Sequence, residues 1–404
     1  MKQNKQLGEV IKSISITHKF DKNELIFLNT SDVLEGKILS NKYFFVSELK
    51  GQAKKTIQNN DILYSEIRPK NKRFAFVNVQ NPEDYVVSTK LMVLRNITND
   101  VDTKYIYYFL TYEGTINYLQ MRAENRIGSF PQITFDILKP IYISLPKLEE
   151  QKKIVKIISS IDDKIELNNK INNELEAMAK TLYDYWFVQF DFPDEHGKPY
   201  KSSGGKMVYN QELKREIPEG WEVENIFKLM DVQYGFPFDT SKFTDDVSQK
   251  PIVRIRDILQ NTISTYSFEE IDNKFMLNKN DLLIGMDGNF HINFWNETGA
   301  YLNQRSVRIR TKEGSKISNF QVYFEITPYI KAREKNVSRT TVGHLSDKDL
   351  KSIFLLVPNL KLNHKSIFDS ILNKLIMNRV QNQELSKLRD WLLPMLMNGQ
   401  VKVK

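Results

Sequence analysis

Basic side chains set among small polar residues are the groups in this sequence best suited to a particular chemistry, the binding of nucleic acid. Lys and Arg bind phosphate oxygens, and the planar Arg guanidinium also pairs with the edge of a guanine. The candidates are Lys54, Lys55, Arg68, Lys70, Lys72, Arg73, Arg122 and Arg126 in the first part of the chain, and Arg254, Arg256, Arg305, Lys331, Arg333, Lys335 and Arg339 in the second. A surface cation is often no more than a solvated charge, so many of these residues are expected to have no such role.

Motifs that would give the chain a catalytic activity of its own are missing from the sequence. NPED (81–84) lacks the second Pro and the aromatic residue of an amino-methyltransferase motif, and GGKM (204–207) has neither the spacing nor the hydroxyl of a Walker loop. Pro193-Asp194 with Glu212-Leu213-Lys214 has the composition of a metal-dependent nuclease motif, but it lies in a stretch rich in Gly and Ser. With no Cys and five scattered His, no metal site is predicted. We therefore expect no catalytic residue and no cofactor bound by this chain.

Charge is distributed unevenly along the sequence. The formal charge of +8 and the pI near 9.1 favour an acidic partner. Residues 1–147 hold 21 basic and 15 acidic side chains, a surplus of six, whereas residues 220–359 hold 18 of each. A nucleic-acid-binding role for the second region therefore requires local clusters of charge. No apolar run approaches the roughly 18 residues needed to span a bilayer, and the start lacks a signal-peptide core, so a cytoplasmic location is expected.

Three pairs of segments show that the chain repeats itself. IFLNTSDVLEG (26–36) matches IVRIRDILQN (252–261), DILYSEI (61–67) matches DLLIGMD (281–287), and ITFDILKPIYISLP (133–146) matches LSDKDLKSIFLLVP (345–358). Runs rich in Val, Ile, Phe and Tyr predict strands within each copy, while residues 104–120 have helical spacing. Each copy is thus predicted to be a mixed α/β module that leads into a long helix.

Asn residues interrupt the apolar seams of both predicted helices. The first helix, about Gln151 to Trp186, has the seam Ile154, Ile158, Ile161, Ile165, Asn168, Ile171, Leu175, Met178, Leu182 and Trp186, and the second has Phe368, Ile371, Leu375, Asn378, Leu385, Leu388, Leu392 and Leu396. Asn172 and Asn382 lie one turn beyond the two seam Asn residues. A polar seam residue penalises every alignment in which it lacks a polar partner, so these Asn pairs are predicted to set the helix register. The alternative is that they face solvent at a local break in the pattern.

Several segments outside the modules carry a family resemblance. LPKLEEQKKIVKIISSIDDKIELNNKINNELEAMAKTLYDYWF (145–187), FDFPDEHGKPYKSSGGKMV (190–208), IPEGW (217–221) and LLPMLMNGQVKV (392–403) resemble the DNA-specificity subunit of Type I restriction-modification systems. The second helix departs from the pattern, because it opens with PNLKLNHK and lacks the EEQ of the first. The two modules match each other only in outline, as expected if they read different sequences.

The resemblance implies a function and a set of partners. Each module would be a target recognition domain that reads half of a split, asymmetric DNA site, and the helices would hold the two domains apart. Two methyltransferase subunits, which carry S-adenosylmethionine, would dock on the chain, as would restriction subunits, which carry ATP and magnesium. Trp186 and Trp391 lie near the C-terminal ends of the helices, where a large ring either anchors such a partner or closes the helix pair.

The expected architecture is an α+β, mixed α/β chain with two globular recognition domains, two long antiparallel coiled-coil helices and an internal pseudo-two-fold repeat. We expect the first recognition domain at 1–147, the central spacer helix at 148–190, a linker at 191–219, the second recognition domain at 220–359, and the distal helix and tail at 360–404. The expected function is a non-catalytic DNA-binding subunit that directs DNA methylation and restriction. The alternative is a stand-alone DNA-binding regulator or architectural protein that dimerises through its helices.

Overall fold

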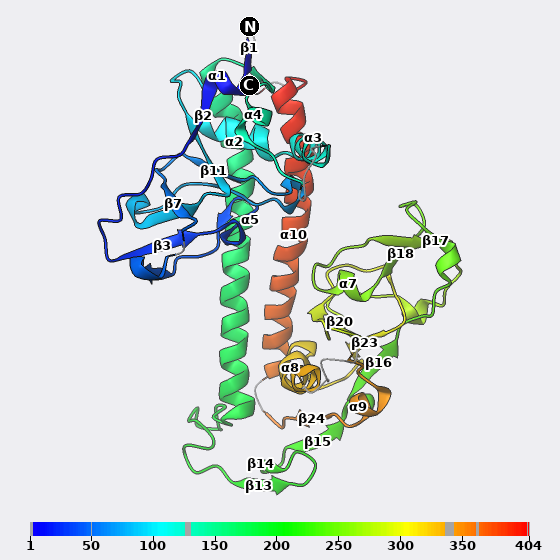
Figure 1. Ribbon diagram of the computed structural model, residues 1–404. Coiled ribbons are helices and arrows are strands. Elements are labelled where there is room, and N and C mark those ends of the chain that lie inside the picture. Colours follow the sequence, from blue (N-terminus) through cyan, green and yellow to red (C-terminus); the bar gives the residue numbers. More distant parts are fainter. Residues whose placement is uncertain are drawn as a thin grey trace. The chain divides into compact units, whose positions relative to one another are not determined.

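Two long helices organise the chain: α5 covers Leu148–Tyr183 and α10 covers His364–Asn398 (Figure 1). The computed structural model describes residues 3–49, 51–125, 131–335, 343–360, 363–401 and 403. It divides into two units, one made of Met1–Lys164 with Leu385–Lys404 and the other of Ile165–Glu384. Each long helix therefore contributes one part to each unit, and the first unit is built from both ends of the chain. None of the described helices is long and apolar enough to cross a membrane.

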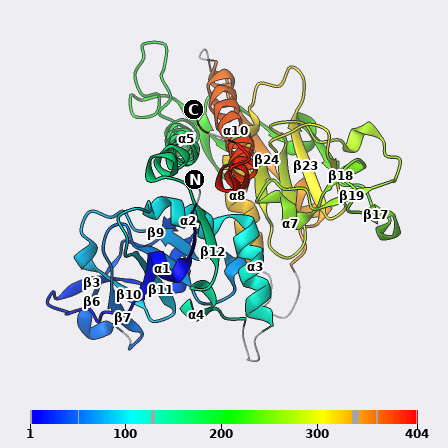
Figure 2. The same ribbon diagram turned by 90° about the horizontal axis from the view of Figure 1, so that it is seen from above.

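The first unit contains two four-stranded sheets. One has the order β2 (Ile11–Ile14), β11 (Leu91–Asn96), β8 (Ile62–Ser65) and β9 (Phe74–Phe76), and the other has the order β6 (Tyr43–Phe45), β3 (Glu24–Leu28), β10 (Tyr85–Ser88) and β7 (Ala53–Thr56). Neighbouring strands are antiparallel except for β3 and β10, which are parallel. In both views the β6-β3-β10-β7 sheet lies on the side away from α5 (Figures 1 and 2).

The remaining elements of the first unit are short. They are β1 (Gln3–Gln6) paired with β12 (Tyr142–Leu145), β4 (Val33–Leu34) paired with β5 (Lys37–Ile38), and the helices α1 (Leu7–Val10), α2 (Thr103–Thr111), α3 (Glu113–Glu124) and α4 (Phe135–Leu138). The helical pattern at 104–120 is confirmed, but it is divided at Tyr112, whose backbone is extended with ψ 151°. Because the following α3 starts afresh there, it takes a direction independent of α2.

Side-chain alternation along the central strands explains how the layers of the first unit pack. In β8, Ile62 and Tyr64 join the core formed with α2, α5 and α10, while Leu63 joins the core beneath the second sheet. Met92 and Val93 of β11 divide in the same way. Successive residues of a strand point to opposite faces, so a strand covered on both sides is apolar throughout. The central sheet is therefore sandwiched between helices and the second sheet.

The second unit repeats this topology. Its central sheet has the order β16 (Met230–Tyr234), β23 (Ser306–Thr311), β20 (Leu282–Gly285) and β21 (Ile292–Phe294), and its second sheet has the order β17 (Phe243–Thr244), β19 (Thr265–Ser267), β18 (Lys250–Val253) and β22 (Tyr301–Leu302). The parallel pair is β18 with β22, as β3 is with β10 in the first unit. The short elements are β15 (Glu222–Asn225) paired with β24 (Phe354–Val357), α6 (Ile226–Leu229), α7 (Ile255–Ile258), α8 (Asn319–Lys335) and α9 (Asp347–Lys351). The internal repeat is thus confirmed in the central sheet and in the parallel pair, whereas the second sheets differ: among the described residues, β7 and the β4–β5 pair of the first unit have no counterpart in the second.

The segment expected to be a linker has a defined structure. It contains a β-hairpin of β13 (Met207–Asn210) and β14 (Arg215–Pro218). Phe192 stacks on Tyr200 at 4.7 Å and on Trp221 at 5.0 Å between ring centroids. These aromatic rings pack into the core of the second unit, which explains why a stretch rich in Gly and Ser is ordered.

Within each unit the parts of α5 and α10 run antiparallel. In the first unit Arg389 donates a 3.1 Å hydrogen bond to Asp162, and Leu393 shares a core with Ile158. Gln151 attaches the start of α5 to the preceding module, because its buried side chain accepts from Asp102 N (2.9 Å) and donates to Pro146 O (2.8 Å). The Gln of the LPKLEEQ segment therefore orients the helix at the point where it leaves the module.

The buried stripe of α5 differs from the predicted seam beyond Asn168. Asn172 and Ala179 are buried, whereas Met178 is exposed, so the assignment of Met178 to the seam is wrong. Ile158, Asn172 and Ala179 are buried and Ile165 is half-buried, at positions separated by seven or a multiple of seven, which matches a coiled-coil repeat. The sequence pattern was obscured because this stripe contains a polar residue and a small one.

Candidate nucleic-acid interface

In the first module, three segments far apart in sequence meet at the end of strand β8. Glu66 N donates to Lys90 O (3.1 Å), Ile133 N donates to Glu66 O (2.8 Å), and Arg68 N donates to Pro131 O (3.0 Å). The Gln132 side chain donates to the Glu66 carboxylate at 2.8 Å. We call Glu66, Arg68, Lys90 and Gln132 the polar edge of the first module.

The same backbone connections recur in the second module with different side chains. Met286 N donates to Arg305 O (2.8 Å), Leu345 N to Met286 O (2.8 Å), and Gly288 N to Gly343 O (2.9 Å). These bonds make position 287 equivalent to 67, 305 to 90, and 344 to 132. We call Asp287, Arg305 and His344 the polar edge of the second module.

Side chains at the second polar edge converge on one carboxylate. Arg305 Nη1 donates to Asp287 Oδ2 at 2.6 Å, and His344 Nδ1 lies 2.6 Å from Asp287 Oδ1. Burial raises the pKa of Asp287, but the hydrogen bonds from His344 and Arg305 more than offset this and hold the pKa below its usual range. Asp287 is therefore an anion that holds two outward-facing donors.

Backbone conformation marks the same place in both modules. Arg68 and its equivalent Gly288 have φ of 44° and 69°, in the left-handed region. Gly adopts this region without cost, whereas Arg does so under strain of about 1 kcal/mol or more. A strained, exposed Arg at the rim of a turn is a feature often retained for function rather than for stability.

The remaining basic candidates of the first module differ in their surroundings. Lys54, Lys70 and Arg122 are exposed. Lys55 is buried and donates to Thr89 O (3.0 Å) and Leu91 O (2.8 Å), and burial lowers its pKa. Arg73 donates to Ser31 O and Val33 O at 3.0 and 3.3 Å, and Lys72 pairs with Glu35 and Glu113 at 3.9 and 3.6 Å. Arg126 lies outside the described residues.

These contacts separate Lys55 from Arg73. Both hydrogen bonds of the buried Lys55 ammonium end on backbone carbonyls of its own module, so we do not propose Lys55 as a DNA contact. Arg73 donates to carbonyls through Nη1 but is only half-buried, so it stays a proposed DNA contact.

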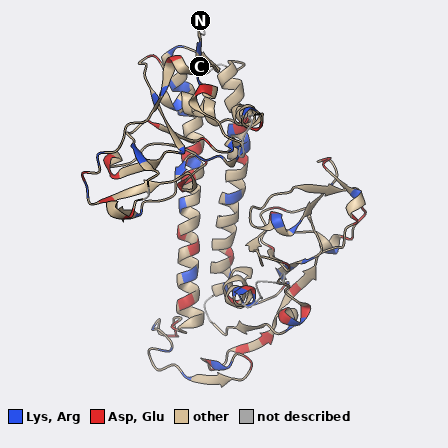
Figure 3. Ribbon diagram, in the orientation of Figure 1, with Lys and Arg blue, Asp and Glu red and all other residues tan. Residues whose placement is uncertain are grey.

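Several candidates of the second module are engaged in local pairs. Arg254 lies over the Phe243 ring at 5.7 Å, and Arg256 donates to Ser264 at 3.0 Å. Arg333 pairs with Asp349 at 2.7 Å, and Lys331 pairs with Glu334 at 2.8 Å. Lys335 is exposed, and Arg339 lies outside the described residues. Lys and Arg are mixed with Asp and Glu along this module, in keeping with the equal numbers of basic and acidic side chains at 220–359 (Figure 3).

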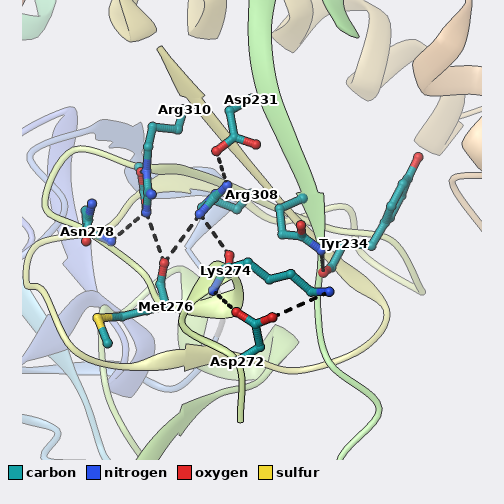
Figure 4. A network of polar contacts seen from close by, with 10 residues as sticks. Asp231, Tyr234, Asp272, Lys274, Met276, Asn278, Arg308 and Arg310 are labelled. Carbon is teal, nitrogen blue, oxygen red and sulfur yellow. Dashed lines mark hydrogen bonds and ion pairs between the residues drawn. The ribbon is translucent and has the colours of Figure 1, made fainter. Parts of the chain in front are cut away.

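Asp–Arg pairs, each with one buried member, link strands and loops within each module. Arg95 donates from Nε and Nη2 to both oxygens of Asp61 at 2.7 Å, and Arg310 makes the same two bonds to Asp281 at 2.7 Å. The second module adds Arg308, which donates to Asp231, Lys274 O and Met276 O (Figure 4). Charges this deeply placed persist only when they are paired and hydrogen-bonded. The network fixes β16 and β23 against the 272–278 loop.

The helix Asn residues lie in the interface of α5 and α10 within the second unit. Asn168 Nδ2 donates to Asn382 Oδ1 and Gln381 Oε1, both at 2.8 Å, and Asn378 Nδ2 donates to Asn172 Oδ1 at 2.9 Å. Asn168, Asn172 and Asn378 are buried, so the solvent-facing alternative is wrong. That these pairs select the helix register stays a prediction.

Trp186 and Trp391 occupy different environments. Trp186 is buried and meets Phe368 edge to face at 6.2 Å, so it closes the core of its own unit and is not available to a partner. Trp391 is 56% exposed and remains a candidate partner contact.

The nuclease-like residues of the hairpin segment do not form a metal centre. The Asp194 carboxylate accepts from the backbone of His196 and Lys198, both at 2.8 Å, which is a local turn. Across the described ranges, no group of three or more His, Asp or Glu side chains could hold a metal ion.

Sequence reasoning missed Glu66, Lys90, Gln132, Asp287 and His344. Glu66 and Asp287 stand in the matching segments DILYSEI and DLLIGMD, which the repeat singled out. The alignment of these segments was the available signal, but the partners at 90, 132, 305 and 344 are recognisable only once the backbone brings them together.

Comparisons with known proteins agree with this architecture. The family model described as "Type I restriction modification DNA specificity domain" matches residues 2–177 and 218–388, one match for each module and part of its helix. The HindI specificity subunit of Haemophilus influenzae is 29% identical, with 98% of each chain covered. The MjaIX specificity subunit of Methanocaldococcus jannaschii is 26% identical over 77% of this chain and 72% of its own.

A solved structure shares the fold. The S subunit of the Type I restriction-modification system from M. genitalium aligns with a TM-score of 0.52 at 14% identity, covering 98% of this chain and 96% of that one. The family match spans both modules and most of both long helices, and it coincides with the repeated topology and the polar edges described above. This chain therefore belongs to the Type I restriction-modification DNA-specificity subunits.

Proposed function

We propose that this chain selects the DNA sequence on which a cytoplasmic Type I restriction-modification complex acts. The observation that carries the proposal is the double match of the specificity-domain model, at 2–177 and 218–388. Each match contains one complete module, so each module is assigned one half of a split DNA site. The polar edges carry unlike residues at equivalent positions, and the two halves are therefore expected to differ in sequence.

The chain is proposed to act as a binding and assembly subunit rather than as an enzyme. Methyl transfer is assigned to two methyltransferase subunits that hold S-adenosylmethionine, and cleavage is assigned to restriction subunits that use ATP and magnesium. Exposed Trp391 on α10 is a candidate contact for such a subunit. The family match favours this function over that of a stand-alone regulator, because a specificity subunit requires a modifying partner.

Methylation in cells provides the direct test. Genomic DNA from cells with and without this gene is compared by sequencing that detects methylated bases. We expect one split motif to be methylated only when the gene is present. Purified chain incubated alone with DNA and labelled S-adenosylmethionine is expected to transfer no label. Identical methylomes in the presence of functional methyltransferase subunits, or transfer by the pure chain, would contradict the proposal.

A further inference from the structure

The polar edge of the second module presents two donors in fixed directions. The side chains of Arg305 and His344 are 69% and 61% exposed, whereas that of Asp287 is 15% exposed. Arg305 adopts φ 65°, an uncommon conformation for a residue other than Gly. The exposed donors are therefore held by a carboxylate that is itself largely covered by protein.

The charges of Asp287 and Arg305 help to distinguish between two kinds of DNA contact, to phosphates and to base edges. Phosphate binding depends on net positive charge and tolerates mobile side chains. Here the Asp287 carboxylate offsets positive charge beside Arg305 and restricts its guanidinium. Reading a base edge needs fixed donor directions more than net charge, and this arrangement supplies them.

We propose that Arg305 and His344 read base edges within the half-site recognised by the second module, and that Asp287 is the residue that positions them. This inference rests on the proposed function. Asp287 engages only one N–H of Arg305 Nη1, so the other N–H of Nη1 and those of Nη2 remain for a bidentate contact to guanine O6 and N7. His344 contacts Asp287 through Nδ1, which leaves Nε2 for a neighbouring group of the DNA.

The first module supplies a matched position with different chemistry. Lys90 and Gln132 replace Arg305 and His344, and Gln132 is tied to Glu66 at 2.8 Å. A Gln side chain pairs naturally with adenine, whereas Arg pairs with guanine. Substitutions at the two edges are therefore expected to alter different half-sites.

The test uses the full chain assembled with its methyltransferase subunits and a DNA library in which every position of the target is randomised. Methylated molecules are sequenced for wild type, Arg305→Ala, His344→Ala, Asp287→Asn and Gln132→Ala. Lys228→Ala is the control, because it removes an exposed charge of the second unit that lies on another element, α6. The thermal midpoint of each variant is measured in parallel.

We expect Arg305→Ala to reduce the preference at one G·C pair roughly 5- to 150-fold, the equivalent of about 1 to 3 kcal/mol. Asp287→Asn should reduce the base preference at the same position, and His344→Ala should reduce it at that position or at its neighbour. Both variants should keep thermal midpoints close to that of wild type. Gln132→Ala should alter only the other half-site, and Lys228→Ala neither. If Asp287→Asn lowers the thermal midpoint, Arg305→Lys is used in its place to test the base contact, since Lys keeps the charge but loses the planar pair of donors.

Two results would overturn the inference. Uniform weakening on all sequences with an unchanged preference would assign these residues to phosphate contacts, and unchanged binding would make them solvated charges. Both outcomes leave the proposed function standing, because wild type still methylates its motif. A wild-type complex without any sequence preference would instead overturn the proposed function and this inference with it.

Discussion

Asn378 Nδ2 donates a 2.9 Å hydrogen bond to Asn172 Oδ1 inside the interface of α5 and α10. Both residues are buried, and Asn172 Nδ2 continues the chain of bonds to Leu375 O at 3.4 Å. A sliding movement of one helix would leave these amides without partners in an apolar interface. Such a penalty is what allows a polar pair to define one alignment.

Removing one member of this pair should cost more stability than removing both. Asn172→Leu leaves the Asn378 amide buried without its acceptor, for a loss of about 1 to 3 kcal/mol, while replacing both partners is often nearly neutral. Urea unfolding of Asn172→Leu, Asn378→Leu and the double variant measures the coupling. Exposed Asn173→Leu serves as the control. Additive losses would show that the two Asn residues act independently.

Stability should depend on pH through Glu325 of α8. Its carboxyl accepts from Leu356 N at 2.8 Å, and burial raises its pKa from an ordinary value of 4.5 to about 7. The folded state therefore holds the proton between these two pH values while the unfolded chain releases it, so stability falls as the pH rises from 4.5 to 7. A pKa difference of this size corresponds to a change of roughly 3 kcal/mol in the free energy of unfolding.

The substitution Glu325→Gln isolates this contribution. The free energy of unfolding of the variant is expected to exceed that of wild type at pH 8, and the difference should shrink toward pH 4.5. Exposed Glu222→Gln on β15 is the matched control, with no comparable pH-dependent difference. Curves for Glu325→Gln and wild type that stay parallel over this range would contradict the assignment.

Two adjacent lysines of β7 should respond in opposite ways to the same substitution. Lys54 is exposed, so Lys54→Ala should leave the unfolding free energy unchanged and, if Lys54 meets a phosphate, reduce the slope of log affinity against log salt by about 1. Lys55→Ala removes the donors of two carbonyl groups and should cost about 1 to 3 kcal/mol without changing that slope. Salt titrations of DNA binding and urea unfolding are the measurements. The opposite pairing of effects would show that the roles are exchanged.

Helix length is expected to set the spacing of the two half-sites. We would insert seven residues, about 10 Å of helix, after Lys164 in α5 and after Leu385 in α10. Insertion at both places keeps Asp162 with Arg389 and Asn168 with Asn382, because both helices lengthen at the same level of the antiparallel pair. Methylome sequencing should show both half-sites unchanged and a longer non-specific gap.

A single insertion provides the control for that experiment. With seven residues added to α10 alone, the Asn pairs and the Asp162–Arg389 pair cannot align at the same time, so methylation should be abolished. If the double insertion changed a half-site sequence and left the gap constant, the helices would have no role in spacing.

The repeat and the helices could be predicted from sequence because their signals are local and periodic. Segment 61–67 aligns with 281–287, and each contains an entire strand of a central sheet, β8 and β20. The difference between Lys54 and Lys55 could not be predicted, since neighbouring strand residues face opposite sides and a dipeptide does not show which side is covered. The polar edges depend on contacts between residues 57 positions apart, as Asp287 and His344 are, which only the folded backbone reveals.

The composition of the first unit from both ends of the chain has a consequence for its synthesis. Its core needs Leu393, Leu396 and Met397, which follow residue 164 by more than 200 positions. At about 5 to 20 residues per second, a ribosome takes on the order of 10 to 50 s to cover that distance. The second unit is continuous from Ile165 to Glu384, so all of it has been translated before the last part of the first. The first unit is thus completed only after the second has been translated, and a chain terminated just before Leu393 would lack part of the core that surrounds residues 7–158.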